Sequence, residues 1–391
     1  TKNKTRARHI QEKSPLKSES SDQHQCIIKK WDDSKKIETK AMTSARKTAE
    51  EIKAFAEKLS HSLSQIRQIG ESAPSTSPHE IVLTGDGFRL LRYGTNPAHD
   101  KKPAVLIVYA LVNRPWVLDL EPKRSMIARL LERGMDVFLV EWLDPKAQDR
   151  TRSLSTYITI MIDQCVDAVN TARRTSRLNL LGVCQGGTLS LCYAALYPKK
   201  VKNLITMVTP VDFQTEDNVL SQWVREVDLD RLVGCYGNVP GSLLNTLFVS
   251  LQPFRLGSKK YIDLIDLADN PARLKTFARM ERWIADSPDQ AGTAFNEFVG
   301  NLYQRNALIK DKFVVDNQIV NLSKIRCPVL NIYALADHIV PASASTALAN
   351  YVGCDDYSEL TFDGGHIGIY VSRQAQQKIP ASIAQWILAR S

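Results

Sequence analysis

Residues 178–196, LNLLGVCQGGTLSLCYAAL, constrain the fold of this chain more than any other segment. The segment opens with a short apolar run, residues 178–183, which is typical of a buried strand. After Gly186-Gly187 the apolar residues recur at helical spacing, which indicates a helix. Between the two halves, residues 182–186 have the form of a nucleophile elbow, a sharp strand-to-helix turn, with Cys184 in place of the usual serine.

Strand and helix patterns alternate from residue 80 onward. The strand patterns cover residues 80–83, 88–93, 104–111, 136–142, 178–183, 201–208, 328–335 and 360–362. Further helical patterns cover residues 125–133, 155–171 and 374–389. This alternation predicts an α/β fold with a mostly parallel, doubly wound sheet. Residues 213–322 lack strong strand patterns and carry bulky aromatic residues, which predicts a helical cap inserted above the carboxyl ends of the strands.

The amino-terminal part has a different character. Of the 391 residues, 1–40 hold eleven Lys and Arg against six acids, which accounts for about five of the nine net positive charges. This stretch is rich in Ser, Lys and Gln, so we expect a disordered basic tail. We favour a solvated tail over contact with nucleic acid or an anionic surface. Residues 41–79 predict a helix and a linker, and the main domain then covers 80–212 and 323–391 around the cap at 213–322.

Composition excludes several classes of protein. The chain is 43% hydrophobic and 24% charged, which is ordinary for a globular protein, and no apolar run is long enough to cross a bilayer. No signal peptide is visible, and the seven cysteines form no Cys-x-x-Cys pair, so we expect reduced thiols and a cytoplasmic protein. There is no Gly-rich phosphate loop and no metal-ligand spacing. We therefore expect neither cofactor nor metal.

The elbow pattern makes Cys184 the candidate nucleophile. The neighbours two positions away must be small, and Gly182 and Gly186 meet this condition. The helix that follows points its positive end and its free N–H groups at Cys184, which favours the reactive thiolate. The backbone N–H of Gln185 is then suitably placed to stabilise an oxyanion.

A thiol nucleophile needs a base, and in this fold class the acid and the histidine follow the nucleophile along the chain. His338 and His366 are the two histidines beyond Cys184. His366 lies in a Gly-flanked loop after a predicted strand, where its side chain can reach over the sheet, so we assign it as the base. His338 directly follows the candidate acid, and adjacent side chains usually diverge.

Asp337 is the candidate acid, because it lies at the carboxyl end of an apolar strand. Asp363 and Asp212 are weaker candidates that suit loop or capping positions better. The order Cys184, Asp337, His366 is thus a triad in the expected sequence. For the second oxyanion donor we consider a backbone N–H near Val112, after the strand at 104–111, although a plain connecting loop is an equal alternative there.

Five motifs together resemble one family. GVCQGG, VYALVNRPW, LITMVTPVDF, ADHIVP and GGHIGIY occur in the chain, and from about residue 82 onward it is similar to the catalytic subunit of class III polyhydroxyalkanoate synthases. The resemblance implies an α/β-hydrolase fold with a helical cap. It also implies that Cys184, Asp337 and His366 are nucleophile, acid and base. The basic segment 1–40 is additional to the family's usual short amino terminus.

The resemblance further implies polymerisation of (R)-3-hydroxyacyl-CoA, mainly 3-hydroxybutyryl-CoA, with release of CoA and growth of a polyester granule. It implies a homodimer that works with a second, dissimilar subunit. A cysteine suits this reaction, because its acyl-enzyme is a thioester as reactive as the CoA donor, whereas a serine ester would match the polymer's own linkages. Asp337 either orients His366 or helps to deprotonate the substrate hydroxyl.

Two other functions remain as alternatives. A Cys-nucleophile hydrolase, either a thioesterase or a polyester depolymerase, would share the elbow and the triad but release the free acid. A non-catalytic protein of the granule surface would recruit partners through its basic tail and would not depend on Cys184. The products formed from 3-hydroxybutyryl-CoA separate a polymerase from a hydrolase, and unchanged CoA release from a Cys184→Ala variant would favour the non-catalytic protein.

Overall fold

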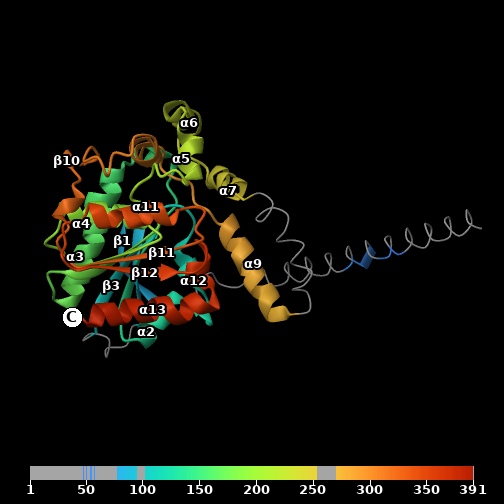
Figure 1. Ribbon diagram of the computed structural model, residues 1–391, viewed down its shortest axis with the longest axis horizontal. Coiled ribbons are helices and arrows are strands. Elements are labelled where there is room, and N and C mark those ends of the chain that lie inside the picture. Colours follow the sequence, from blue (N-terminus) through green and yellow to red (C-terminus); the bar gives the residue numbers. More distant parts are fainter. Residues whose placement is uncertain are drawn as a thin grey trace, which may run out of the picture. The chain divides into compact units, whose positions relative to one another are not determined.

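A computed structural model describes residues 77–94, 102–252 and 270–390, together with five isolated helical positions, 47, 50, 53, 54 and 57. The chain divides into two compact units, residues 1–64 and 65–391. The predicted basic tail at 1–40 and most of the predicted helix and linker at 41–79 lie outside the described residues. Figure 1 shows how the helices and strands of the second unit are arranged.

The second unit is built on an eight-stranded sheet with the order β1-β2-β6-β3-β7-β8-β11-β12. Its strands are β1 (His79–Gly85), β2 (Phe88–Tyr93), β3 (Ala104–Val108), β6 (Asp136–Trp142), β7 (Leu178–Val183), β8 (Val201–Met207), β11 (Val329–Ala334) and β12 (Tyr357–Phe362). β1, β2 and β6 pair antiparallel, and every further pairing is parallel. The alternation in the sequence therefore predicted the sheet correctly.

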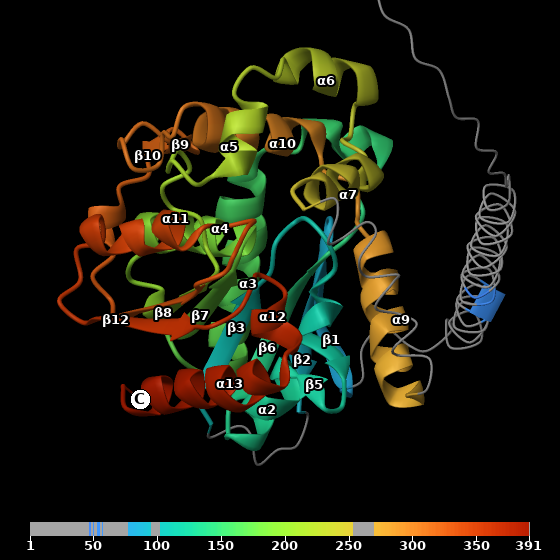
Figure 2. The ribbon, with the colours of Figure 1, turned by 45° about the vertical axis from the view of Figure 1, so that its right-hand side comes forward.

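Helices cover both faces of the sheet (Figure 2). On one face lie α3 (Ile162–Arg173) and α4 (Gln185–Leu196), and on the other lie α2 (Met126–Glu132) and α13 (Arg373–Leu388). β3 is buried along its whole length, and its alternate residues join different cores: Leu106 packs with α3 and α4, whereas Ile107 packs with α2 and α13. This two-sided burial explains the continuous apolar runs of the central strands.

The described residues between β8 and β11 add no strand to this sheet. Its described residues form α5 (Val219–Val224), α6 (Leu229–Tyr236), α7 (Gly241–Ser250), α9 (Pro271–Ala285), α10 (Gly292–Phe298) and a π-helical segment, Val299–Gln304. A two-stranded ribbon, β9 (Val314–Val315) with β10 (Gln318–Ile319), comes next along the chain. In Figure 2, α5, α7 and α10 lie beyond the end of the sheet at which α4 begins.

Three details differ from the sequence prediction. The predicted strand at 104–111 ends at Val108, because the next groups bond to side chains: the Tyr109 carbonyl accepts from Trp142 Nε1, and the Leu111 N–H donates to Gln185 Oε1. The predicted helix at 155–171 begins with a π-helical stretch, Thr156–Met161. A short ribbon of β4 (Asp119–Glu121) and β5 (Arg124–Ser125) precedes α2 and was not predicted.

Candidate active site

Cys184 lies at the turn between β7 and α4. Its backbone adopts φ +55° and ψ −125°, which is a strained conformation for a residue with a side chain. The Cys184 N–H donates to the Met207 carbonyl of β8 at 2.9 Å, and the Cys184 carbonyl accepts from the Gly187 N–H at 2.9 Å. These bonds hold the strained turn, so the half-buried thiol projects from the carboxyl edge of the sheet.

The glycines around Cys184 explain why the motif reads Gly-x-Cys-x-Gly-Gly. A Cβ on Gly182 would meet the backbone of Gly187, and a Cβ on Gly186 would meet the carbonyl groups of Val108 and Tyr109. At Gly187 it would collide with the side chain of Thr209. Each glycine therefore allows a close approach between α4 and a neighbouring strand or loop, as the sequence pattern predicted for Gly182 and Gly186.

Asp337 and His366 follow the neighbouring parallel strands β11 and β12. The two loops stay paired beyond the strands, because the Ala336 N–H donates to the Gly364 carbonyl at 2.9 Å. His366 Nδ1 donates to Asp337 Oδ2 at 2.7 Å, and the imidazole also interacts electrostatically with Cys184. The structure thus brings the three candidate catalytic residues together.

The imidazole of His366 is 5% exposed, and its electrostatic setting is dominated by its two partners. Burial alone would lower its pKa. The charges of Asp337 and Cys184, together with the hydrogen bond to Asp337, outweigh burial and raise the pKa of His366 to about 10. The protonated ring is therefore stabilised between a carboxylate and a sulfur.

Both oxygens of the Asp337 carboxylate are engaged. Oδ2 accepts from His366, and Oδ1 accepts from the backbone N–H groups of Ile339 and Val340, each at 2.9 Å. The side chain of Asp337 has no solvent-exposed area. The carboxylate is thus fixed in position and turned toward the imidazole.

Two tyrosine rings help to keep this part of the site dry. The ring of Tyr370 meets that of His366 edge to face, with centroids 5.9 Å apart, and Tyr109 packs edge-on against Tyr370. Burial, followed by neighbouring groups that include Cys184, raises the pKa of both phenols well above the ordinary value. Both phenols are therefore neutral, and their rings form an apolar wall.

The candidate oxyanion donors belong to residues that line the larger cavity together with Cys184. Gln185 is the first residue of α4, so its backbone N–H has no acceptor within the helix. Val112 lines the same cavities as Cys184. The two positions are linked by a contact that the sequence did not predict, because Gln185 Oε1 accepts from the N–H of Leu111, the residue before Val112, at 3.0 Å.

The loop that carries Val112 is also held by contacts with α9. Arg114 Nε and Trp116 Nε1 both donate to the Asp286 carboxylate at the end of α9, at 3.2 and 3.1 Å. Trp283 Nε1 donates back to the Arg114 carbonyl at 2.7 Å. No local pattern in the sequence could have revealed these contacts, because their partners are about 170 residues apart.

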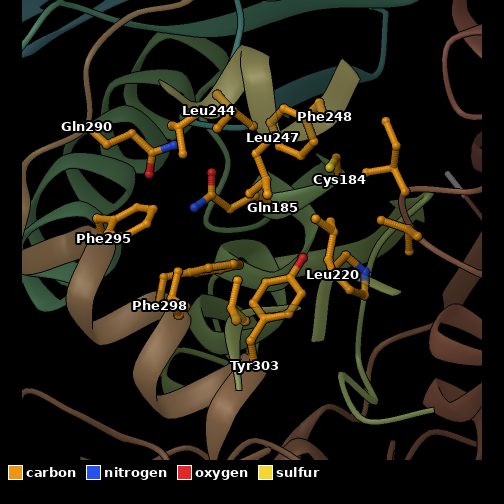
Figure 3. A pocket seen from close by; sticks show the side chains of 16 residues that line it. Cys184, Gln185, Leu220, Leu244, Leu247, Phe248, Gln290, Phe295, Phe298 and Tyr303 are labelled. Atoms are coloured by element: carbon orange, nitrogen blue, oxygen red, sulfur yellow. The ribbon is translucent and has the colours of Figure 1, made fainter. Parts of the chain in front are cut away.

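Two cavities meet at Cys184. The larger has an empty volume of about 670 Å³ and is shown in Figure 3. Its wall is mostly apolar and is contributed largely by the helices between β8 and β11, with Leu220, Val224, Leu244, Leu247, Phe248, Phe295, Phe298, Val299 and Tyr303 among the lining residues. The smaller cavity, of about 350 Å³, contains His366, Tyr109, Asn113 and Trp283. Val112, Cys184, Phe248 and Ile339 line both.

The weaker acid candidates lie elsewhere. Asp363 is exposed, and Asp212 bonds to the Gln214 N–H and to the side chain of Asn306.

Cys165 and Cys192 are buried on their helices, and burial raises the pKa of each thiol. Among the described residues, no group of His, Cys, Asp or Glu could hold a metal ion, and no helix is long and apolar enough to cross a membrane.

Comparison with known proteins gives a consistent result. Residues 103–372 match the α/β-hydrolase fold family. The poly(3-hydroxyalkanoate) polymerase subunit PhaC of Allochromatium vinosum is 46% identical over 346 residues, which cover 88% of this chain and 98% of that protein. The corresponding subunit of Synechocystis is 41% identical over 86% of this chain and 91% of its own length. That of Haloferax mediterranei is 33% identical over 90% of this chain and 72% of its own length.

Among solved structures, a lipase candidate from Sulfolobus solfataricus aligns with a TM-score of 0.50 at 13% sequence identity. The alignment covers 82% of this chain and all of that one. At this identity the likeness shows the fold alone.

Proposed function

The chain belongs to the family of poly(3-hydroxyalkanoate) polymerase subunits, and from this premise we propose that it polymerises (R)-3-hydroxyacyl-CoA, mainly 3-hydroxybutyryl-CoA, through a thioester on Cys184. The observation that carries the proposal is the contact of one buried imidazole with both Cys184 and Asp337. A nucleophile, a base and an orienting acid in this arrangement are the requirements for acyl transfer.

Loading begins with the Cys184 thiolate and the protonated His366. The sulfur attacks the thioester carbonyl of the substrate and forms a new carbon–sulfur bond. The bond to the CoA sulfur then breaks, and His366 gives its proton to the departing CoA thiolate. One thioester is replaced by another, so this step is nearly thermoneutral.

Extension uses the same groups in the opposite sense. The 3-hydroxyl of an incoming substrate loses its proton to His366 as its oxygen attacks the acyl group on Cys184. An ester bond forms and the Cys184 thiolate leaves. A thioester is exchanged for an oxygen ester, so this step runs downhill.

We assign Asp337 the orienting role. Its Oδ2 accepts from His366 and its Oδ1 is occupied by two backbone N–H groups, which supports a carboxylate that positions the ring rather than one that takes a substrate proton. The backbone N–H groups of Gln185 and Val112 are our candidates for stabilising the oxyanion.

We also propose that residues 213–322 act as a cap over the core segments 80–212 and 323–391. Water must be kept from the acyl-enzyme, because hydrolysis would end chain growth. The apolar side chains of this stretch that line the larger cavity support that role.

We further propose partners and a location by analogy with the family. The relatives bear the name of polymerase subunits, which supports a second, dissimilar subunit. A homodimer at the surface of a cytoplasmic polyester granule completes the proposal. We assign no nucleic acid, cofactor or metal to the reaction.

The test is to incubate the chain with 3-hydroxybutyryl-CoA, with and without a second synthase subunit, and to measure both released CoA and polymer. We expect CoA and polyester together, and the Cys184→Ala variant should form neither. Free hydroxybutyrate as the main product would instead identify a hydrolase. Unchanged CoA release from Cys184→Ala would exclude the proposed nucleophile.

A further inference from the structure

The two cavities at Cys184 offer different chemistry to the two sides of a bound thioester. The smaller one contains His366, so the groups that exchange protons with the ring, the CoA sulfur and the incoming hydroxyl, belong on that side. The larger one does not contain His366 and is walled mainly by apolar side chains. If the proposed mechanism holds, the acyl group bound to Cys184 extends into the larger cavity.

The carboxamide of Gln185 lies in this larger cavity, and its orientation is determined by one contact. The Leu111 N–H can only donate, so the atom that faces it at 3.0 Å must be the amide oxygen. The amide nitrogen of Gln185 is therefore the atom directed away from the loop. Figure 3 shows this carboxamide among the side chains that line the cavity.

Within the described part of the chain, nothing accepts a hydrogen bond from the Gln185 amide nitrogen, although Gln185 is only 6% exposed. The nitrogen is accessible from the cavity, so it can donate to a group bound there. The Gln290 carboxamide lies in the same cavity, is 5% exposed, and makes no side-chain hydrogen bond within the described residues. Besides the Cys184 thiol and the Tyr303 hydroxyl, the mostly apolar cavity wall thus contains two amides whose donors have no acceptor within the described residues.

Two amides in a mostly apolar wall suit a polyester chain, because their N–H groups can donate to the oxygen atoms that recur along it. We propose that the Gln185 amide nitrogen donates to the oxygen on carbon 3 of the acyl group held by Cys184, and so selects 3-oxygenated acyl groups over plain ones. That oxygen is a hydroxyl in the first unit and an ester oxygen in a growing chain, and both can accept. Gln290, farther along the cavity wall, would serve the next unit in the same way.

The test compares 3-hydroxybutyryl-CoA with butyryl-CoA, which differs by that oxygen alone. Released CoA in the first turnover gives the acylation kcat/KM for each. We expect the wild type to prefer the hydroxylated substrate about 10- to 100-fold. In Gln185→Met, which removes both ends of the amide, the preference should fall at least about tenfold.

A second variant separates substrate selection from loop positioning. Gln185→Glu keeps an acceptor for the Leu111 N–H but loses the donor, so it should lose the preference as well. A merely structural role would slow both substrates equally in Gln185→Met and leave their ratio unchanged. Gln385→Met, at an exposed position of α13, is the matched control and should keep the wild-type ratio.

The inference fails if the wild type shows no preference, or if both Gln185 variants keep it. The proposed function is judged separately, from the product: polymer supports it and free acid contradicts it, whatever the ratio. A hydrolase that still loses its preference in both variants would overturn the polymerase and leave the role of Gln185 intact.

Discussion

The two sides of the active site are built in different ways. On the sheet side, Cys184, Asp337 and His366 are held by backbone bonds between adjacent strands and by glycines that permit close contact. On the helical side, the cavity wall consists of apolar side chains from α5, α7 and α10 and from the π-helical segment. Polar side chains at the end of α9 join the two sides.

The difference assigns separate tasks to the two sides. Groups that transfer protons need fixed distances, and a close-packed sheet edge provides them. A cavity wall that holds an acyl chain of variable length must fit the shape of that chain and exclude water, and it depends less on fixed distances. We therefore expect substitutions on the sheet side to reduce the rate of the chemical step or the stability of the fold strongly. Substitutions on the helical side should reduce both quantities less.

The largest effect is expected for Asp337→Asn. Loss of the negative charge would leave His366 poorly oriented and less basic, and we expect CoA release to fall about 10³- to 10⁴-fold. The rate of CoA release measures this, with circular dichroism as the control for folding. A loss of less than tenfold would show that the sheet side does not depend on the carboxylate.

A pair of glycine substitutions compares the two sides directly. In Gly186→Ala the new methyl group would meet the carbonyl groups of Val108 and Tyr109, and we expect a loss of about 3 kcal/mol in the free energy of unfolding. In Gly234→Ala, on α6, the methyl group would have no neighbour within 4 Å, and a helical alanine should leave stability unchanged or raise it by up to about 1 kcal/mol. Urea denaturation measures both. Equal losses would remove the distinction.

The raised pKa of His366 predicts how stability depends on pH. The folded state holds the proton up to a pH of about 10, whereas an unfolded histidine releases it near 6.5. This contribution is fully present below pH 6.5 and is lost as the pH rises toward 10, at no more than about 1.4 kcal/mol per pH unit. Urea denaturation between pH 6 and 10 should show the decline. His366→Asn should lack this part of the slope, and an identical slope in that variant would contradict the assignment.

The smallest effect is expected at the contact between the two sides. Asp286→Ala removes the acceptor for Arg114 and Trp116, which loosens the loop carrying Val112, and we expect CoA release to fall about fivefold, or about 1 kcal/mol. Stability should change by less than this, since the carboxylate is 41% exposed. Asp144→Ala removes another partner of Arg114 without touching α9 and is the matched control. An unchanged rate of CoA release in Asp286→Ala would show that the helical side has no part in holding this loop.

The sequence predicted the sheet side well, because its signals are local. Strand patterns marked all eight strands of the main sheet, and the glycines around Cys184 marked the elbow. The loops after β11 and β12 meet because parallel neighbours end at the same edge. The proximity of Asp337 and His366 thus followed from the order of the strands.

The contacts of the Val112 loop could not be predicted in the same way. The bond between Gln185 and the Leu111 N–H spans 74 residues, and those from Arg114 and Trp116 to Asp286 span about 170. Neither has a spacing that a helix or a strand would impose. They depend on how the helices between β8 and β11 pack, and the apolar pattern of those helices does not specify that packing.

The engagement of both oxygens of Asp337 has a consequence for the order of events. If this carboxylate can accept nothing from a substrate, a single ring nitrogen must serve both halves of the cycle. It must give its proton to the departing CoA thiolate before it can take a proton from the hydroxyl group of the next substrate. Release of CoA and extension of the chain must therefore alternate, and the slower of these two steps limits the rate at which each polymer molecule grows.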